Sequence, residues 1–241
     1  MFKKEKSDKE KVEDLYLIIK DLKSFCNNKI NELNNKIENQ NIQIKKLQKK
    51  LEEKNNSNLS IINISNIFKD SLIINQNLMY ISYLKKWISP NDIPFTTKLL
   101  FRKSNNGDSF EEFHKLCDNQ GKTLVLIKGE EGFIIGGYTT KNWDKSGNWY
   151  KDNNSFLFSL TNGQIFPIRK NMDSIRGSKE SGPWFAYIGF RNKGKKNLTQ
   201  GYFHYHDEGD RSFENYDKII PNEKKDRFFN VTEIEIYKIE K

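Results

Sequence analysis

The chain has 241 residues, of which 35% are hydrophobic and 30% are charged, and its formal net charge at pH 7 is +9. This length allows one or two domains, and the composition is more polar than that of a single compact globule. The charged residues 1–11 are not followed by an apolar stretch, and no run of about 18 apolar residues occurs. The sequence therefore predicts no signal peptide and no transmembrane segment, and we expect a cytoplasmic protein.

The positive charge is spread along the chain. Residues 1–58 carry fourteen Lys against ten Asp or Glu, a net charge of +4, and the remaining +5 is distributed over residues 59–241. A nucleic-acid-binding protein is expected to concentrate its basic residues on one face or in one run. Pairs such as Lys45 and Lys46 are interleaved with apolar positions, which favours a solvated helix face. We predict no nucleic-acid partner, and a membrane or nucleic-acid adaptor acting through this lysine-bearing helix is an alternative.

A long helix is expected near the beginning of the chain, because residues 10–54 contain neither proline nor glycine. From residue 30 the seam positions recur every seven residues, with Ile at a and mostly Leu at d. Parallel two-stranded coiled coils favour this combination, and a polar Gln40 in the seam helps to fix the register. We predict a homodimer through this coiled coil, and the alternative is a single amphipathic helix folded back on the globular part. The predicted self-association residues are Ile30, Leu33, Ile37, Gln40, Ile44, Leu47 and Leu51.

An Ile- and Asn-rich connector follows a short polar break at residues 55–58. Its second half is expected to form an amphipathic helix that packs on the following domain. Pro90 and Pro94 stop this helix. The side chains expected on its apolar face are Ile67, Ile74, Leu78, Ile81 and Ile88.

The globular core is expected to begin near residue 90, because nearly all Trp and Phe residues lie beyond it. Residues 98–102 predict a strand. Ser109 and Glu112 then form a capping box at the start of a short helix. Gly121 is expected to end this helix.

Short apolar runs bounded by glycine or turn residues predict the remaining strands. The pair Asn162 and Gly163 between two such runs is the strongest hairpin signal in the chain. In the last strand, isoleucines alternate with Glu233 and Glu235, as in a strand with one exposed face. The predicted strands are residues 123–128, 133–138, 155–160, 164–168, 184–190, 201–205 and 228–239, with loops at 141–154 and 169–182.

These elements define the expected architecture. We predict a coiled-coil helix at residues 1–58, an amphipathic helical connector at 59–94 and a globular domain at 95–241. Many short strands with one clear helix among them predict an α+β, mainly β fold. The globular domain is expected to be a two-sheet antiparallel β-sandwich with peripheral helices, preceded by the long N-terminal helix.

Few residues suggest chemistry. Cys26 and Cys117 lie in different segments, so no disulfide framework is expected. His114 and Cys117 are one helical turn apart, so a thiolate–imidazolium pair is the catalytic or redox alternative. The segment at residues 204–207, His-Tyr-His-Asp, offers too few ligands for zinc. Gly136 and Gly137 favour close packing of an aromatic ring from a facing sheet. We therefore predict no catalytic, cofactor-binding or metal-binding residues and no cofactor.

The segment from residue 95 to 239 closely resembles the TLDc domain family. The family pattern has a Phe-His-x-x-Cys-Asp segment, a Gly, a Thr-Leu strand, a Gly-Gly-aromatic, a Trp and a Phe-Leu-Phe-Ser-Leu strand. The segment at residues 182–188 departs from the family, which usually has a glycine-rich stretch and an Asp there. The matching residues are Phe113, His114, Cys117, Asp118, Gly121, Thr123, Leu124, Gly136, Gly137, Tyr138, Trp143 and residues 155–160.

The resemblance implies a fold of two antiparallel sheets with flanking helices. It also implies a role in oxidative-stress resistance and binding to the vacuolar proton-pumping ATPase, and it brings no established catalytic residues. Our leading hypothesis is a non-enzymatic interaction protein that dimerises through its coiled coil and docks on a large complex. The competing hypotheses are a redox-active or catalytic module that uses Cys117 and His114, and the membrane or nucleic-acid adaptor.

Overall fold

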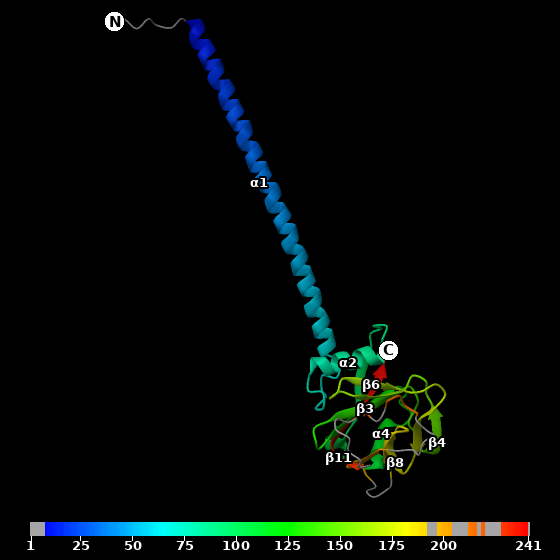
Figure 1. Ribbon diagram of the computed structural model, residues 1–241. Coiled ribbons are helices and arrows are strands. Elements are labelled where there is room, and N and C mark those ends of the chain that lie inside the picture. Colours follow the sequence, from blue (N-terminus) through cyan, green and yellow to red (C-terminus); the bar gives the residue numbers. More distant parts are fainter. Residues whose placement is uncertain (1–7, 192–196, 204–211, 216–217, 220–227, 241) are drawn as a thin grey trace. The chain divides into compact units, whose positions relative to one another are not determined.

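The computed structural model describes residues 8–191, 197–203, 212–215, 218–219 and 228–240, and within these ranges the side chains of residues 8 and 52–65 are left out. The chain divides into two compact units, Met1–Ile61 and Ile62–Lys241. The first unit is built from one long helix, and the second holds all the described strands (Figure 1).

Helix α1 spans Asp8–Ser65 and confirms the predicted long helix. It continues through residues 55–58, so the predicted polar break is wrong. Asn and Ser are less favourable than Ala in a helix by roughly 0.7 kcal/mol or less each. A short polar run without proline or glycine therefore does not stop a helix. The side chains described along residues 9–51 are all exposed.

A turn segment, residues 66–76, leads into helix α2, Leu78–Ile88. Asn77 caps α2, since its side-chain oxygen accepts hydrogen bonds from the backbone N–H groups of Met79 and Tyr80 at 3.0 and 3.2 Å. This cap satisfies two of the N–H groups that a helix leaves unpaired at its start. The helix ends at Ile88, before Pro90, as predicted.

The apolar face predicted for this connector is only partly correct. Ile81 and Ile88 are buried on α2 together with Leu84. Ile67 and Ile74 instead lie in the preceding turns, and Leu78 is exposed. Helical spacing identifies the residues that α2 buries, but it cannot separate a helix from the folded turns beside it.

Antiparallel strands build the second unit as a two-sheet sandwich, as predicted. Among the described residues, β6-β5-β3-β2-β11-β10-β9-β8 form one continuous hydrogen-bonded order, β1 also pairs with β11, and β4 pairs with β7. These elements are β1 (Thr96–Arg102), α3 (Lys103–Asn106), α4 (Phe110–Cys117), β2 (Thr123–Gly129), β3 (Ile134–Thr139), β4 (Ser146–Lys151), β5 (Phe156–Ser159), β6 (Gln164–Pro167), β7 (Asp173–Ser178), β8 (Ser181–Trp184), β9 (Ile188–Arg191), β10 (Gln200–Phe203) and β11 (Phe228–Glu240).

Strand β11 joins the two layers. Its first residues, from Phe228 to Asn230, pair with β10. From Val231 the strand pairs with β2 along one edge, with a register shift between Val231 and Glu233, and from Glu235 it also pairs with β1 along the other edge. The first layer is therefore β6-β5-β3-β2-β11-β1, and the second is β11-β10-β9-β8.

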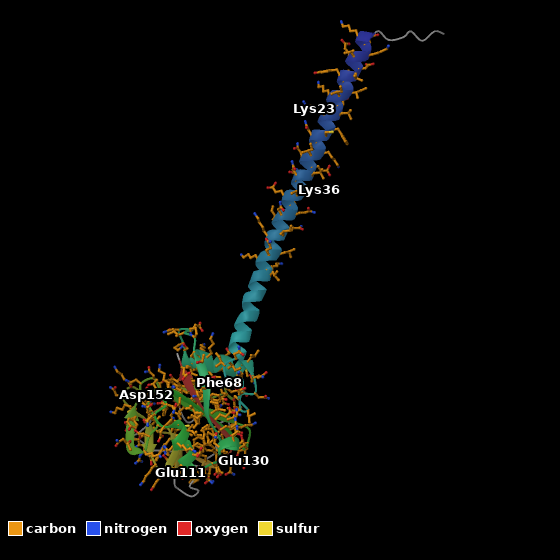
Figure 2. The ribbon with its side chains drawn as sticks, turned by 180° about the vertical axis from the view of Figure 1, so that it is seen from behind. Lys23, Lys36, Phe68, Glu111, Glu130 and Asp152 are labelled. Atoms are coloured by element: carbon orange, nitrogen blue, oxygen red, sulfur yellow. The ribbon has the colours of Figure 1, made fainter. Side chains whose placement is uncertain are left out.

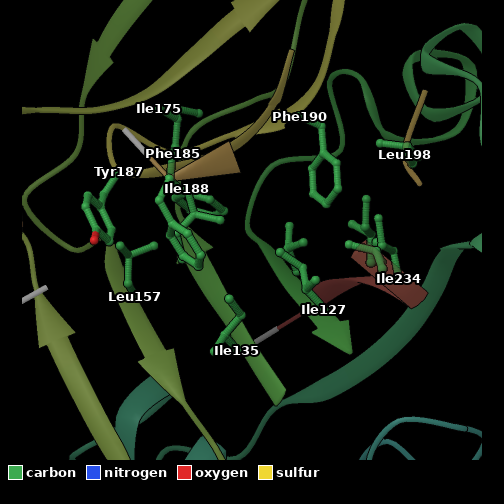
Figure 3. Packing of buried hydrophobic residues seen from close by; sticks show 14 of the residues in the cluster. Ile127, Ile135, Leu157, Ile175, Phe185, Tyr187, Ile188, Phe190, Leu198 and Ile234 are labelled. Carbon is green, nitrogen blue, oxygen red and sulfur yellow. The ribbon is translucent and has the colours of Figure 1, made fainter. Parts of the chain in front are cut away.

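The main core lies between these layers. In Figure 3, Ile127, Ile135 and Leu157 of the first layer lie close to side chains of the second. Those facing side chains are Phe185, Ile188 and Phe190. Large apolar side chains such as these supply most of the hydrophobic stabilisation of a sandwich.

A second apolar cluster covers the other face of the first layer. Leu84 and Ile88 of α2 pack there with residues such as Leu124, Leu126 and Phe158. The central strands are thus buried on both faces. This explains why β2 and β3 appear in the sequence as continuous apolar runs without alternation. The prediction that the connector packs on the following domain is confirmed.

Glu235 is buried on this same face, contrary to the expectation of an exposed alternating glutamate. Its carboxylate accepts hydrogen bonds from Arg102 Nε at 2.8 Å, from the backbone N–H of Leu72 at 2.9 Å and from Ser71 Oγ at 2.5 Å. The neighbouring Tyr237 hydroxyl donates at 3.3 Å. The carboxylate therefore joins the turn segment 66–76 to two adjacent strands of the sheet.

Several strand predictions are confirmed. The hairpin of β2 and β3 pairs from Thr123 with Thr139 to Lys128 with Ile134. The Asn-Gly turn joins β5 and β6, and Gly163 has a φ of 63° as such a turn requires. Strands β1, β10 and β11 also match their predicted positions over the described residues.

Other local predictions are wrong. The expected loops at 141–154 and 169–182 contain β4 and β7, and the expected single strand at 184–190 is the end of β8, a turn and most of β9. Helix α4 ends at Cys117, four residues before Gly121, which lies in the following turn with a φ of 80°. The N-terminal cap is as predicted, because Ser109 Oγ accepts from the backbone N–H of Glu112 at 3.1 Å.

Candidate interaction surfaces

The predicted His114 and Cys117 pair lies buried on α4. His114 Nδ1 is 2.7 Å from a carboxylate oxygen of Asp118. Its Nε2 is 2.8 Å from the carbonyl oxygen of Ser178 and 3.0 Å from that of Ser181. The imidazole thus fastens α4 to the turn between β7 and β8, and its ring nitrogens contact oxygen atoms rather than the thiol.

The environment of Cys117 disfavours its thiolate. The side chain is fully buried among the main core residues. Burial, with a further contribution from the charge of Asp118, raises the pKa of the thiol well above its usual range. Because the thiolate is the nucleophilic form, a thiol held protonated is a poor nucleophile. These features weigh against the redox-active or catalytic alternative.

Metal coordination finds no support in the part of the chain that the structure describes. Within that part, no group of three or more His, Cys, Asp or Glu side chains could hold a metal ion. The weak candidate ligands of the sequence, His204 and His206 with Asp207, lie outside the described residues. Within the same described part, no helix is long and apolar enough to cross a lipid bilayer.

The Gly136 and Gly137 pair has the close-packing role that the sequence predicts. A Cβ at Gly137 would lie only 2.5 Å from the ring of Phe185, which comes from the facing layer. A Cβ at Gly136 would lie 2.6 Å from Phe158 on the neighbouring strand and 1.9 Å from a carbonyl oxygen of Val125. Both glycines therefore serve packing.

The side chains of the predicted self-association seam are exposed on α1. The exposed fraction is 54% at Ile30, 54% at Ile37 and 51% at Ile44. Figure 2 shows side chains projecting from all sides of this helix, with Lys23 and Lys36 labelled. The remaining seam side chains, Leu33, Gln40, Leu47 and Leu51, are exposed as well. An apolar stripe of this length in contact with water is a candidate interaction surface.

Short-range ion pairs lie beside the seam on α1. Glu32 accepts from Lys29 and from Lys36, each at 2.8 Å. These contacts lower the pKa of Glu32. Because the three side chains are exposed and lie within one helix, they contribute little to stability.

A second candidate surface lies on the outward face of the second layer and its neighbouring strands. Alternation places Ile188 and Phe190 of β9 in the core and Arg191 on the opposite face, and the same alternation holds on β10 and β11. Register places Trp149 opposite Arg176, Tyr202 opposite Phe228, and both Trp184 and Tyr202 opposite Gly189 of β9. Contacts between side chains then connect these residues across six strands. We call this row the aromatic–arginine ladder; it consists of Trp149, Arg176, Trp184, Arg191, Tyr202 and Phe228.

Arginines and rings contact one another along the ladder, and two ring pairs also touch directly: Trp149 with Trp184 at 5.5 Å and Tyr202 with Phe228 at 4.9 Å between ring centres. The guanidinium of Arg176 lies 5.6 Å from the ring centre of Trp149 and 4.9 Å from that of Trp184. The guanidinium of Arg191 lies 5.5 Å from Trp184 and 4.6 Å from Tyr202. These distances fall within the range of cation–π attraction. The position of each charge is therefore restricted by the two rings that its guanidinium contacts, and Trp184 is shared by both.

No local pattern in the sequence marks this ladder, because its members lie on six different strands and meet only in the folded sandwich. One member does come from the segment that departs from the family pattern, since Trp184 ends β8. Gly182 of this segment is tightly packed, and a Cβ there would lie 2.4 Å from Leu198.

Comparison with known proteins gives the family. The model of the TLDc domain family matches residues 67–240, which is well over half of the chain. The chain belongs to the TLDc domain family. The match begins inside the turn segment and includes α2, which agrees with the packing of both on the first layer. The predicted boundary at residue 95 stays a prediction.

Individual relatives match shorter parts of this chain than the family model does. MTOR-associated protein MEAK7 of Gallus gallus is 32% identical over 71 residues, which is 30% of this chain and 15% of the relative. The protein of the same name from Xenopus laevis is 25% identical over 112 residues, which is 42% of this chain and 24% of the relative. The chain thus matches less than a quarter of the length of either relative.

Proposed function

We propose that the chain is a non-enzymatic interaction protein, whose TLDc domain docks on a protein complex and whose helix α1 mediates self-association. The family match over residues 67–240 carries the first part of this proposal. The buried, protonated thiol of Cys117 supports a non-catalytic role. The proposed partner is the vacuolar proton-pumping ATPase, with a contribution to oxidative-stress resistance.

The relatives' names favour a second candidate partner. They describe association with MTOR, so a complex containing MTOR is the other partner to be tested. In both cases the proposed role of the chain is binding, and the chemistry belongs to the partner.

Self-association would be parallel in this proposal. Three of the four g positions beside the seam carry lysine (Lys29, Lys36 and Lys50) and the fourth is Gln43, while the e positions carry Asn or Gln. In an antiparallel pair, g positions face g positions, so these lysines would repel one another. In a parallel pair each lysine faces a neutral amide instead, and the charge pattern therefore favours the parallel dimer. Two copies of the TLDc domain held together would raise avidity for a partner that presents two sites.

Affinity capture tests the partner. The tagged full chain is incubated with native lysate of its source cells, and bound proteins are identified by mass spectrometry. We expect pump subunits among them, and MTOR if the second candidate is correct. A doubly substituted Ile37→Asn, Ile44→Asn chain should capture less, because avidity is lost. Absence of pump subunits and of MTOR from the wild-type capture would contradict both candidate partners.

A further inference from the structure

The aromatic–arginine ladder points to the kind of surface that the TLDc domain recognises. We propose that the ladder docks an acidic segment of a partner protein, whose Asp or Glu carboxylates bind the guanidinium groups of Arg176 and Arg191. This inference rests on the proposed function, because it assigns a surface to the protein partner of the domain.

The arginines are preorganised for carboxylates. Each guanidinium lies against two rings, which hold the planar group in one orientation. A planar guanidinium matches the two oxygens of a carboxylate, and charge-assisted pairs of this kind are about twice as strong as neutral hydrogen bonds. Arginines that are already ordered lose less side-chain entropy on binding.

The guanidinium groups also retain unused donors. Among the described residues, Arg176 donates from Nε to the carbonyl oxygen of Gly147 at 3.2 Å, and neither arginine forms an ion pair. Arg191 Nε is buried and has no hydrogen-bond partner within the same part of the chain. Because this Nε is covered, a carboxylate from solution would bind half-buried Arg191 through its outer Nη groups.

Charge complementarity supports an acidic partner. The described strands β4, β7, β8, β9 and β10 contain the basic residues Lys151, Arg176 and Arg191. Their one acidic residue, Asp173, lies opposite Lys151 in the β4–β7 register. The two ladder arginines are thus the uncompensated charges of these strands, and the exposed rings at the two ends, Trp149 and Phe228, offer apolar contact beside them.

The same geometry disfavours a nucleic acid. Single-stranded nucleic acids bind by stacking their bases on open aromatic faces. In the ladder the central rings, Trp184 and Tyr202, are only 7% and 6% exposed, and guanidinium groups cover them. What remains available in the middle of the ladder is a pair of cationic donors.

Fluorescence anisotropy with the full chain tests the proposal. The probe is a fluorescein-labelled decapeptide of glutamate, titrated at an ionic strength of about 0.15 M, where distant exposed charges are largely screened. We expect Arg176→Gln and Arg191→Gln each to weaken binding at least about fivefold, since each removes one charge-assisted contact. The matched control is Arg169→Gln, an exposed arginine off the ladder that removes the same charge. The affinity of this control for the peptide should change less than about twofold, because salt largely screens an exposed charge that does not contact the peptide.

A second variant tests the shape of the guanidinium groups while both positive charges are kept. The doubly substituted Arg176→Lys, Arg191→Lys chain keeps both charges but lacks the planar fork, and it should also bind at least about fivefold more weakly. Equal losses in the Arg169 control, or full affinity in the lysine variant, would overturn the proposal. Tighter binding of a labelled ten-residue uridine oligonucleotide, with the same dependence on both arginines, would overturn it in favour of a nucleic acid.

The outcomes separate this inference from the proposed function. Capture of pump subunits or MTOR that is insensitive to Arg176→Gln and Arg191→Gln would leave the function standing and reject the ladder as its surface. Arginine-dependent peptide binding without capture of either complex would support the ladder and reject the named partners.

Discussion

Single residues decide how closely the two layers approach. Gly137 lies where the ring of Phe185 crosses the central strand, and no space remains for a Cβ. The sequence predicts this role, because two adjacent glycines inside an apolar strand mark a close approach of another group. The sequence does not predict which ring approaches Gly137. Phe185 lies between β8 and β9, and the continuous apolar run at residues 184–190 gives no sign that the chain turns there.

Substitution at this contact should be costly. We expect Gly137→Ala to lower the free energy of unfolding by about 1–3 kcal/mol, the usual cost of overpacking a core. Urea unfolding followed by tryptophan fluorescence measures it. The double variant Gly137→Ala, Phe185→Leu should lose less than the sum of the two single variants, because the smaller side chain makes room. Strict additivity would contradict the contact.

The thiol of Cys117 should make stability depend on pH. Burial raises its pKa in the folded state, so the unfolded thiol releases its proton first, above about pH 8.5. The stabilisation is complete below that pH and is lost as pH rises, with a slope of up to about 1.4 kcal/mol per pH unit. Urea unfolding between pH 7 and 10 should show a steeper decline for the wild type than for Cys117→Ala. Parallel declines would contradict a thiol held protonated by the fold.

A labelling control addresses the redox alternative. A thiol reagent should modify exposed Cys26 in the folded protein and both cysteines in urea. Rapid modification of Cys117 in the folded protein would revive the redox-active hypothesis.

At the level of elements, prediction succeeds where the sequence pattern is local. The hairpin of β2 and β3 and the Asn-Gly hairpin of β5 and β6 are marked by apolar runs with turn residues between them. Strand β4 escapes prediction because nearly all its side chains are exposed and no alternation exists to detect. The end of α1 is not predicted correctly, because the polar residues at 55–58 weaken the helix without ending it.

Of the two candidate surfaces, one can likewise be predicted from a local sequence pattern and the other cannot. The α1 seam can be predicted because heptad spacing is a pattern within one helix. The aromatic–arginine ladder cannot, because its members, from Trp149 to Phe228, lie on six strands that come together only in the folded sandwich.

The turn segment 66–76 should depend on the carboxylate of Glu235. We expect Glu235→Gln to cost about 3 kcal/mol, because it leaves the buried Arg102 charge without its counter-ion. Thermal or urea unfolding measures this loss. Glu240→Gln, an exposed glutamate on the same strand, is the matched control and should change stability by less than about 0.5 kcal/mol. Equal effects of the two substitutions would mean that the buried pair contributes nothing specific.

For the whole molecule, the seam on α1 should determine whether the protein is a dimer or a monomer in solution. We expect sedimentation equilibrium to show a dimer that dissociates in the Ile37→Asn, Ile44→Asn chain, because two a positions that the dimer would bury become polar. Ile42→Asn is the matched control, since Ile42 is an exposed isoleucine of the same helix that lies outside the seam. A monomeric wild type, or equal dissociation by the Ile42 control, would show that the seam does not mediate self-association.

Strand β11 also constrains when the domain can fold. It lies at the centre of the sandwich, yet it follows every other described strand in chain order, and Thr96 of β1 pairs with Glu240. A ribosome must therefore release nearly all of this segment before either layer can close, and pairing across so long a separation is slow. Helix α1 needs only local hydrogen bonds and emerges first. Nascent chains could thus meet through their helices while their sandwiches are still unfolded.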